Sequence, residues 1–379
     1  MSPLSGVGQY TTCGLAALMA LMPETEFHLF LGVRWSRALP QDGGPAVGAG
    51  SMMAAVANVA RRFRPARAVW HRYCRLRFVP RVRALAPDLV YATNYLPPGP
   101  VLRSVPVVPV IYDLSHLRIP EAHPVRRVRR LERLSALAPD ALAVVTISEF
   151  SKREIVTLLG VAEDNVIVAP PGVSPAFGPV DAARRRGVLA AHGLEDGRYV
   201  LAVGNLEPRK NLRTLIGAYA HLPASLRRRY PLALAGGAGW GDAGTGDATA
   251  AGLQRAGELR LLGYVPGAHL PALYGGAAAF CFPSLYEGFG MPVVEAMVCG
   301  APVIASTAAS VPEAAGDAGL LCDPRDGAAW TEALRRVLED AAYAAALRAA
   351  GPRQAARFTW EACAAKTLEA FARCNAPTR

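Results

Sequence analysis

The chain has 379 residues, of which 52% are apolar and 19% are charged, with 36 glycines and 31 prolines. This length predicts two domains, and the composition excludes a disordered chain, a collagen and a coiled coil. The net charge is +11, and only Lys152, Lys210 and Lys366 among the 41 basic residues are lysines. No apolar run reaches the ~18 residues of a membrane-spanning helix, and no signal peptide is recognisable, so we expect a cytoplasmic protein.

The cysteines indicate reduced thiols rather than disulfides or metal ligands. Their number is odd, they form no CxxC pair, and most lie in apolar contexts. We therefore expect no metal site. The seven positions are 13, 74, 281, 299, 322, 363 and 374.

Short apolar runs that end at turn residues alternate with helical stretches, which predicts βα units and parallel sheets. The predicted strands of the first half span 88–94, 107–113, 141–148 and 166–169. Clustered prolines and glycines at 170–179 then place a domain boundary near 175. A second series of strands spans 199–204, 231–236, 259–263, 278–283 and 302–306. The fold class is thus α/β, with two doubly wound, Rossmann-like domains, 1–175 and 176–357, facing a central cleft.

The loop after the strand 199–204 carries two adjacent cations, Arg209 and Lys210, just before a predicted helix at 212–220. Ligands of open α/β sheets bind beyond the carboxyl ends of the strands, and a helix N-terminus attracts anions. The loop is therefore a candidate phosphate site, with a solvated basic turn as the alternative. The sequence has no GxxxxGK[ST] motif, which disfavours a P-loop NTPase.

The loop after the strand 278–283 carries two glutamates. Gly288 and Gly290 permit a tight turn, and Pro292 suits the first helical position, so Glu287 precedes the helix and Glu295 lies about one turn into it. Carboxylates are good acceptors for hydroxyl groups. With the cationic loop, they predict a ligand that combines a diphosphate with hydroxyls, a nucleotide sugar. The alternative is that Glu295 only complements the helix dipole and Glu287 is solvated.

A glycine-rich stretch at 236–244 satisfies GxGxxG with Gly239, Gly241 and Gly244. This motif alone suggests a dinucleotide fold, but the following residues are a poor helix start and the next strand ends at Tyr264 without an acidic residue. We expect a flexible loop on the substrate side.

The motifs at 204–211, 262–265, 283–297, 300–306 and 311–319, with the Glu-x7-Glu spacing of Glu287 and Glu295, resemble the retaining glycosyltransferases of family 4. That family has the two-Rossmann-domain fold called GT-B. Further similar segments lie at 5–10, 87–90, 146–152, 171–173 and 358–361. The resemblance implies that the last segment, 358–379, is a helix that crosses back to the first domain.

The resemblance also implies roles. Lys210 would contact the donor diphosphate, Glu287 the transferred sugar and Glu295 the ribose. The remaining donor-binding positions are Gly6 and Gly8 in a loop of the first domain, Gly204 and Asn205, Tyr264 and Val265 in the turn that would cradle the base, and Gly288, Phe289, Gly290, Met291 and Pro292. Members of this fold need no metal, so no cofactor is expected and the nucleotide sugar is a substrate.

The chain departs from the family pattern at three places. Asn205 stands where many members have an arginine, so Arg209 would supply that charge. Tyr112 stands where members commonly have a histidine, which leaves His116 and Asp113 as candidate catalytic residues of the first domain. The opening strand of the first domain should precede residues 3–8, but only Met1 and Ser2 do, so we expect that strand to be missing. Either the start codon was placed too far downstream, which we favour, or the first sheet lacks a central strand.

The implied activity is retaining hexosyl transfer from a nucleoside-diphosphate sugar, GDP-mannose as first guess, to a saccharide or polyprenyl-linked acceptor in bacterial surface polysaccharide or lipopolysaccharide synthesis. A retaining glycosidase is disfavoured by the phosphate-type cations beside the glutamates, and an epimerase on the same fold stays possible. A non-enzymatic nucleic-acid-binding protein would explain the charge, but no aromatic residues interleave with the arginines as a stacking platform would require. We expect no nucleic-acid partner.

Two arginine clusters of the first domain suggest peripheral contact with an anionic membrane, on the cytoplasmic face of the inner membrane. The alternative is a solvated arginine-rich face. The clusters comprise arginines 61, 62, 64, 67, 72, 75 and 77, and arginines 126, 127, 129, 130 and 133.

Overall fold

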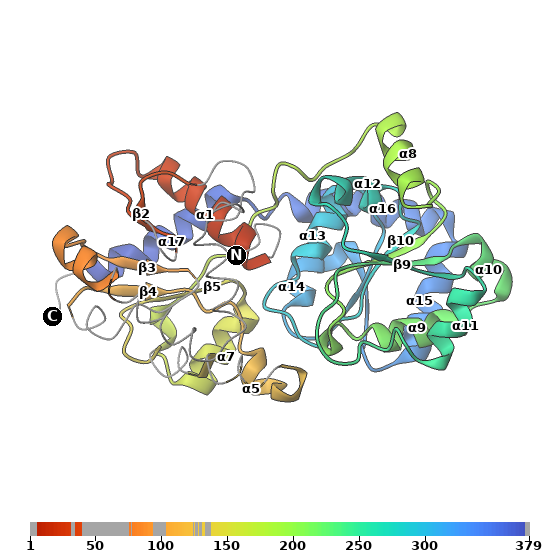
Figure 1. The fold of residues 1–379 in the computed structure, drawn as a ribbon, viewed down its shortest axis with the longest axis horizontal. Helices are drawn as coiled ribbons and strands as arrows, with labels where there is room; N and C mark the ends of the chain where they lie inside the picture. Colours follow the sequence, from red (N-terminus) through yellow and green to blue (C-terminus); the bar gives the residue numbers. More distant parts are fainter. Residues whose placement is uncertain are drawn as a thin grey trace.

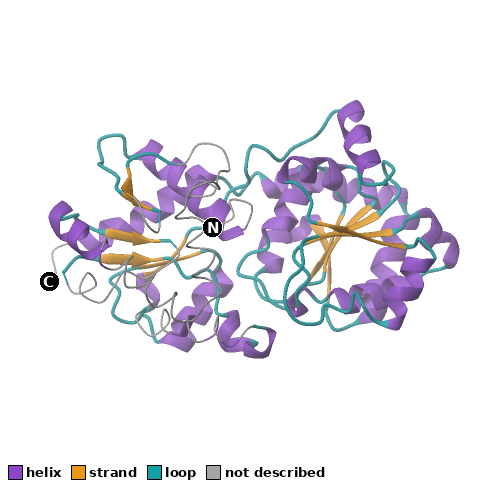
Figure 2. Ribbon diagram, viewed as in Figure 1, coloured by secondary structure: helices purple, strands orange, loops and turns teal. Residues whose placement is uncertain are grey.

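The computed structural model describes residues 6–31, 35–39, 76, 78–93, 104–123, 125, 128, 131–132 and 138–375. The chain forms two lobes, each with parallel strands and helices packed against them (Figures 1 and 2). The predicted α/β fold with two Rossmann-like domains is therefore confirmed.

The second lobe contains a six-stranded sheet whose order is β12-β11-β10-β7-β8-β9, with every neighbouring pair parallel. Its strands are β7 (Val200–Val203), β8 (Leu232–Ala235), β9 (Leu259–Gly263), β10 (Ala279–Phe282), β11 (Val303–Ser306) and β12 (Gly319–Cys322). The first five lie within the predicted runs. The sequence analysis missed β12, a short edge strand whose first three residues are only partly buried.

Helices cover both faces of this sheet (Figure 2). On one face α9 packs against α15, and on the other α13 packs against α16. The helices of this lobe are α8 (Ala182–Ala191), α9 (Leu212–Ala220), α10 (Ala224–Arg229), α11 (Ala248–Arg255), α12 (Leu270–Gly275), α13 (Met291–Val298), α14 (Val311–Ala315), α15 (Gly327–Glu339) and α16 (Ala341–Ala355).

Successive residues of β10 serve opposite faces of the sheet. Phe280 and Phe282 pack into the core beneath α13, whereas Cys281 packs into the core beneath α9 and α15. All three are at most 2% exposed. Strands covered on both faces appear in the sequence as unbroken apolar runs, which explains why β10 was recognisable.

The first lobe begins with α1 (Gly6–Leu21) and a two-residue antiparallel pair, β1 (Leu29–Phe30) and β2 (Trp35–Ser36). Two parallel pairs follow, β3 (Val90–Ala92) with β4 (Val107–Pro109), and β5 (Val144–Thr146) with β6 (Val166–Val168). A bridge between Val110 and Val145 joins the two pairs. The lobe also holds α5 (Ser115–Arg118) and α7 (Glu149–Leu159).

The last helix, α17 (Trp360–Asn375), lies in the first lobe against α1 (Figure 1). The two crossings of the chain between the lobes run side by side, since the Val173 N–H donates to the Phe358 carbonyl at 3.2 Å. The Trp360 ring meets the edge of Tyr10 on α1, with centroids 5.9 Å apart. The end of the chain thus fastens the second lobe to the first.

Several expectations fall outside the described residues. They are the missing opening strand, Cys74 and the arginines of both clusters. None of the six cysteines in the described part forms a disulfide. No helix within that part is both long and apolar enough to cross a membrane.

Candidate active site

Two loops meet where the strand order of the six-stranded sheet reverses. From β7 the chain proceeds outward to β8 and β9, and from its neighbour β10 it proceeds the other way to β11 and β12. Such a switch point is where open α/β sheets bind ligands. The loop that follows β7 is called here the phosphate loop (residues 204–211), and the loop that follows β10 the glutamate loop (residues 283–290).

A buried cluster of charges joins the two loops. The Lys210 Nζ lies 2.6 Å from Oε1 of Glu287, and the Arg209 Nη1 lies 2.8 Å from Oε2 of the same carboxylate. The Arg209 Nε also donates to Glu207 at 3.0 Å. The side chains of Arg209, Lys210 and Glu287 are at most 18% exposed. The structure therefore brings together three residues that the sequence analysis selected from separate loops.

The charges of this cluster depend on one another. Burial alone would raise the pKa of Glu287, but Arg209 and Lys210 outweigh that effect and lower it to about 2. Burial lowers the pKa of Lys210, and Glu287 opposes this shift. Burial likewise acts to lower the pKa of Arg209, but Glu287 and Glu207 raise it overall. Glu287 is therefore ionised throughout the neutral range and serves as the counter-ion of both cations.

Local backbone structure holds the cations in place. Residues Pro208–Lys210 form a 3₁₀ turn, and Asn211 then adopts the left-handed conformation with φ 56° to start α9. The Asn211 side-chain amide donates to the Pro283 carbonyl at 3.0 Å, and the Leu285 N–H donates to the Arg209 carbonyl at 2.9 Å. The phosphate loop and the glutamate loop are thus fastened to each other by their backbones as well as by ion pairs. α9 spans the predicted residues 212–220.

The glutamate loop ends at an uncapped helix start. Gly290, with φ 111°, precedes α13, and no side chain caps the first N–H groups of that helix. α13 begins at Met291, one residue before the position predicted from Pro292. Uncapped N–H groups at a helix N-terminus bind anions. The start of α13 therefore presents backbone N–H groups that no side chain caps at the end of the glutamate loop.

Glu295 lies one turn into α13, as predicted, and is 5% exposed. Its Oε2 accepts a hydrogen bond from the Tyr274 hydroxyl at 3.1 Å. Burial raises its pKa to about 7, although hydrogen bonds from Tyr274 and from Gln9 of α1 act in the opposite direction. Glu295 is thus a carboxyl group that changes charge near neutral pH, unlike Glu287.

The first lobe contributes α1 to this region. Gly6 and Gly8, expected in a loop, instead occupy the first turn of α1. A Cβ at Gly6 would lie 3.5 Å from Sδ of Met291, so the start of α1 faces the start of α13. Both glycines are helical rather than in a loop because residues 6–21 form a continuous helix that packs on α17.

Asp113 and His116, the two candidates of the first lobe, differ in their surroundings. The Asp113 carboxylate accepts bonds from the backbone N–H and the hydroxyl of Ser115 at 3.0 and 2.6 Å, and its charge helps raise the pKa of Arg209. His116 is on α5 and only 1% exposed. Tyr112 directs its hydroxyl to the Thr93 carbonyl at 2.6 Å. The structure thus places Asp113 near the cations.

The turn expected to cradle a base follows β9. Tyr264 is 65% exposed, whereas Val265 is 7% exposed. The Gly236 N–H donates to the Gly263 carbonyl at 2.8 Å. A Cβ at Gly236 would lie 1.9 Å from the Gly204 carbonyl oxygen. Gly236, just after β8, therefore permits close packing between the phosphate loop and the turn after β9. α11 begins only at Ala248, after the GxGxxG residues.

Asn205 lies on the exposed side of the phosphate loop.

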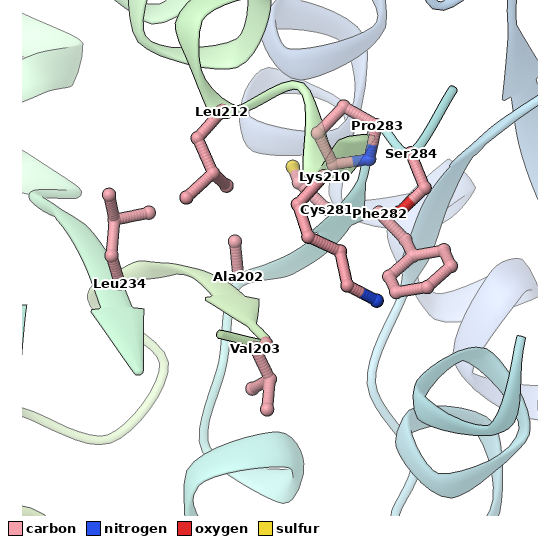
Figure 3. Close-up of a pocket in the computed structure, with 10 residues that line it drawn as sticks. Ala202, Val203, Lys210, Leu212, Leu234, Cys281, Phe282, Pro283 and Ser284 are labelled. Carbon is pink, nitrogen blue, oxygen red and sulfur yellow. The ribbon is translucent and has the colours of Figure 1, made fainter. Parts of the chain in front are cut away.

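Beneath the phosphate loop is a small cavity of about 10 Å³, lined by Lys210, Phe282 and Ser284 among others. Figure 3 shows the Lys210 amino group beside the Phe282 ring, and its Nζ lies 5.1 Å from the ring centroid. The long side chain of Lys210 is thus held by an aromatic ring and by Glu287.

The sequence analysis did not select Tyr274, Tyr286, Glu154 or Glu313, all of which contact site residues or join the lobes at the site. Tyr286 directly precedes Glu287, which was a usable signal. Glu154 lies on α7 of the first lobe, and no motif in the sequence pointed to it.

In the described part of the chain no three His, Cys, Asp or Glu side chains are grouped as metal ligands would be.

Comparison with known proteins identifies the family. Residues 30–177 match the family model described as Glycosyltransferase Family 4, and residues 189–354 match the model described as Glycosyl transferases group 1. The O-antigen chain mannosyltransferase B of Escherichia coli is 34% identical over 97% of this chain and 96% of its own length. The serotype-specific mannosyltransferase WbdA of Escherichia coli is 34% identical over 61% of this chain, but the match spans only 29% of WbdA.

Solved structures share the fold at lower identity. Sucrose-phosphate synthase of Thermosynechococcus elongatus superposes with a TM-score of 0.68 at 22% identity, covering 99% of this chain and 94% of its own. WaaG, a glycosyltransferase involved in lipopolysaccharide biosynthesis, has a TM-score of 0.64 at 14% identity, covering 97% and 96%. Together with the relative that matches over 96% of its length, these findings show that the chain is an enzyme and belongs to the GT-B glycosyltransferases, with the family 4 and group 1 domains in that order.

Proposed function

We propose that this enzyme transfers a hexose from a nucleoside-diphosphate sugar to a saccharide or polyprenyl-linked acceptor with retention at the anomeric carbon and without a metal ion. GDP-mannose is the first donor to test, and synthesis of a bacterial surface polysaccharide of the O-antigen type is the proposed process. The observation that carries the proposal is the cluster of Arg209, Lys210 and Glu287 at the switch point of the sheet. The similarity to an O-antigen chain mannosyltransferase supports the choice of sugar and process.

The leaving group is a nucleoside diphosphate, so the main demand on the enzyme is to stabilise negative charge as the bond between the anomeric carbon and the phosphate oxygen breaks. Arg209, Lys210 and the N–H groups at the start of α13 are preorganised for that purpose. A new bond forms between the acceptor oxygen and the anomeric carbon on the same face. The acceptor proton passes to the departing phosphate oxygen, which balances the reaction without a protein nucleophile.

The two glutamates serve hydroxyl groups in this proposal. Glu287 binds the transferred sugar once the diphosphate takes its place as the counter-ion of the cations, and Glu295 binds the ribose. Both carboxylates are buried, and desolvated carboxylates accept strong hydrogen bonds from hydroxyl donors. The base would lie at the turn of Tyr264 and Val265.

The identity of the base calls for a direct measurement. HepE of Anabaena, a structural neighbour with a TM-score of 0.63 at 20% identity, was solved in complex with UDP and glucose, and it covers 84% of this chain. A thermal-shift panel of GDP, UDP, dTDP and ADP separates the candidates. We expect the largest increase in melting temperature with GDP.

The activity test uses GDP-mannose with a saccharide acceptor and, in parallel, a polyprenyl-diphosphate-linked acceptor. We expect transfer in the presence of EDTA and an α-linked product by NMR, because GDP-mannose is α-linked. An inverted product would refute retention, and loss of activity with EDTA would refute metal independence. Conversion of the nucleotide sugar without any acceptor would favour the epimerase alternative.

We also propose that the first domain, residues 1–175, holds the acceptor, that residues 176–357 hold the donor, and that residues 358–379 return to the first domain. The arginine clusters of the first domain would then hold the enzyme against an anionic membrane, where a polyprenyl-linked acceptor resides. Flotation with liposomes of anionic phospholipid at low salt tests this. A protein that stays unbound there has no such membrane contact.

A further inference from the structure

The hydroxyl of Tyr286 connects the glutamate loop of the second lobe to two elements of the first lobe. It accepts a hydrogen bond from the Leu114 N–H at 3.2 Å and donates one to Oε2 of Glu154 at 2.7 Å. Leu114 lies next to Asp113, and Tyr286 lies next to Glu287. One hydroxyl therefore links the neighbours of two proposed site residues that are 174 positions apart in the chain.

The contact extends beyond Tyr286 into the first lobe. Oε1 of Glu154, on α7, accepts a hydrogen bond from the Arg118 Nε at 2.6 Å, and Arg118 ends α5. Glu154 is only 7% exposed, whereas the Arg118 side chain is 49% exposed. The start of α5 is thus connected to Tyr286 directly, through the Leu114 N–H. The end of α5 is connected to Tyr286 indirectly, because Arg118 and Tyr286 both bind Glu154.

The surrounding packing leaves little freedom for this contact to shift. The Tyr286 ring meets the edge of Phe150, with centroids 5.5 Å apart. A Cβ at Gly288 would lie 2.3 Å from the Tyr112 carbonyl oxygen, so glycine is needed there for the loops to touch. Burial raises the pKa of Tyr286, so its hydroxyl stays protonated and remains a donor to Glu154.

We propose that Tyr286 is a positioning residue for the transfer reaction, whose hydroxyl sets the glutamate loop against the loop that carries Asp113. This inference rests on the proposed function, in which the second lobe holds the donor and the first lobe the acceptor. Both hydrogen bonds of the hydroxyl are made to groups of the first lobe. Its role is to fix the distance between the two halves of the site, and small misplacements of reacting groups reduce rates strongly.

The test compares Tyr286→Phe with a matched control, Tyr219→Phe. Each change removes one buried hydroxyl and keeps the ring. The Tyr219 hydroxyl bonds the carbonyls of Arg227 and Tyr230, both at 3.0 Å, inside the second lobe. Because both acceptors of that hydroxyl lie in the second lobe, Tyr219→Phe reports what a lost buried hydrogen bond does by itself.

We expect kcat of Tyr286→Phe to fall about 10- to 100-fold, with nucleotide affinity unchanged because the cations and α13 are intact. Tyr219→Phe should lower the melting temperature and keep kcat. Combining Tyr286→Phe with Glu154→Gln should reduce kcat by less than the product of the single effects, because both changes break one contact. Wild-type kcat in Tyr286→Phe, or an equal loss in Tyr219→Phe, would overturn the proposal.

Hydrogen exchange gives a readout that does not need activity. The Leu114 amide loses its acceptor in Tyr286→Phe, and we expect faster exchange at this amide, but not in Tyr219→Phe. Unchanged exchange in Tyr286→Phe would contradict the inference. A wild-type enzyme that transfers no sugar would instead contradict the proposed function, and hydrogen exchange would then decide only whether the Tyr286 hydroxyl orders the loop of the first lobe.

Discussion

The Lys210 amino group and the Glu287 carboxylate are bonded to each other at 2.6 Å, within a cluster that also includes Arg209. The cation proposed to hold the diphosphate is therefore already neutralised by the carboxylate proposed to hold the sugar. An incoming donor brings its own negative charge to Lys210 and Arg209 and hydroxyl donors to Glu287. Binding thus exchanges one set of charged contacts for another. The buried charges are paired in the free enzyme as well, so none of them is left buried without a partner before the donor binds.

Loss of one member of this cluster should affect both activity and stability. Lys210→Ala and Glu287→Ala should each abolish most transfer. Glu287→Ala should destabilise the fold by about 3 to 5 kcal/mol because Lys210 loses its buried partner, and Lys210→Ala by less, because Glu287 keeps Arg209. Urea denaturation at pH 7.5 and initial rates measure the two effects.

The double variant Lys210→Met, Glu287→Gln separates stability from activity. It leaves no uncompensated charge from the pair, so it should be more stable than either single variant and equally inactive. Recovery of transfer in the double variant would contradict the proposed roles of both residues.

Nucleotide binding should depend on the charge of Glu295, whose pKa is raised to about 7. The ionised carboxylate accepts hydrogen bonds from ribose hydroxyls, so the affinity for the nucleotide sugar, whose esterified diphosphate does not titrate in this range, should increase from pH 6 to pH 8. The groups beside it, Tyr274, Gln9 and Cys299, hold no charge in that range. Calorimetry on the wild type and on Glu295→Gln checks this, since the variant should bind more weakly and lose this pH dependence.

The same carboxyl group should affect stability with the opposite trend. Its pKa is raised in the folded state, so the unfolded chain loses the proton first as pH rises, and the folded state is progressively disfavoured until about pH 7. Glu295→Gln removes this effect. The free energy of unfolding of Glu295→Gln minus that of the wild type should therefore increase by roughly 2 to 3 kcal/mol between pH 5 and pH 8. A difference that is independent of pH would show that Glu295 is not buried as described.

Glu313 on α14 should help hold the lobes together. Its carboxylate accepts bonds from the N–H groups of Glu149 and Phe150 at 2.8 and 2.7 Å, the first two residues of α7. A carboxylate at a helix N-terminus stabilises by about 0.3 to 2 kcal/mol. Glu313→Ala should open the lobes, seen as a larger radius of gyration, and should lower kcat.

Glu332→Ala is the control for Glu313. Glu332 is an exposed carboxylate on α15 whose partner is Arg335 at 2.7 Å in the same helix. It should change neither the radius of gyration nor kcat. An unchanged radius in Glu313→Ala would show that other contacts suffice to hold the lobes.

Much of the fold and part of the site were accessible from the sequence. The buried strands of the second lobe appear as apolar runs because both sheet faces are covered, and α9 begins and ends where its pattern predicts. That the loops of Arg209, Lys210 and Glu287 meet at one sheet edge also followed, because parallel strands deliver their loops to the same edge, but their ion pairing did not follow. The edge strand β12 and the helical start at Gly6 did not follow, since edge exposure and packing on α17 leave weak local patterns.

Local pattern and spacing therefore established the α/β fold, the family resemblance and which loops carry charge. Tertiary packing decided that Glu287 bridges two cations, that Glu295 is buried enough for its pKa to reach about 7, and that Tyr286 contacts Glu154. The physical reason is that periodicity reflects the environment of one segment at a time. The charge state of a carboxyl and the partner of a hydroxyl depend on groups from distant segments, which only the folded chain brings together.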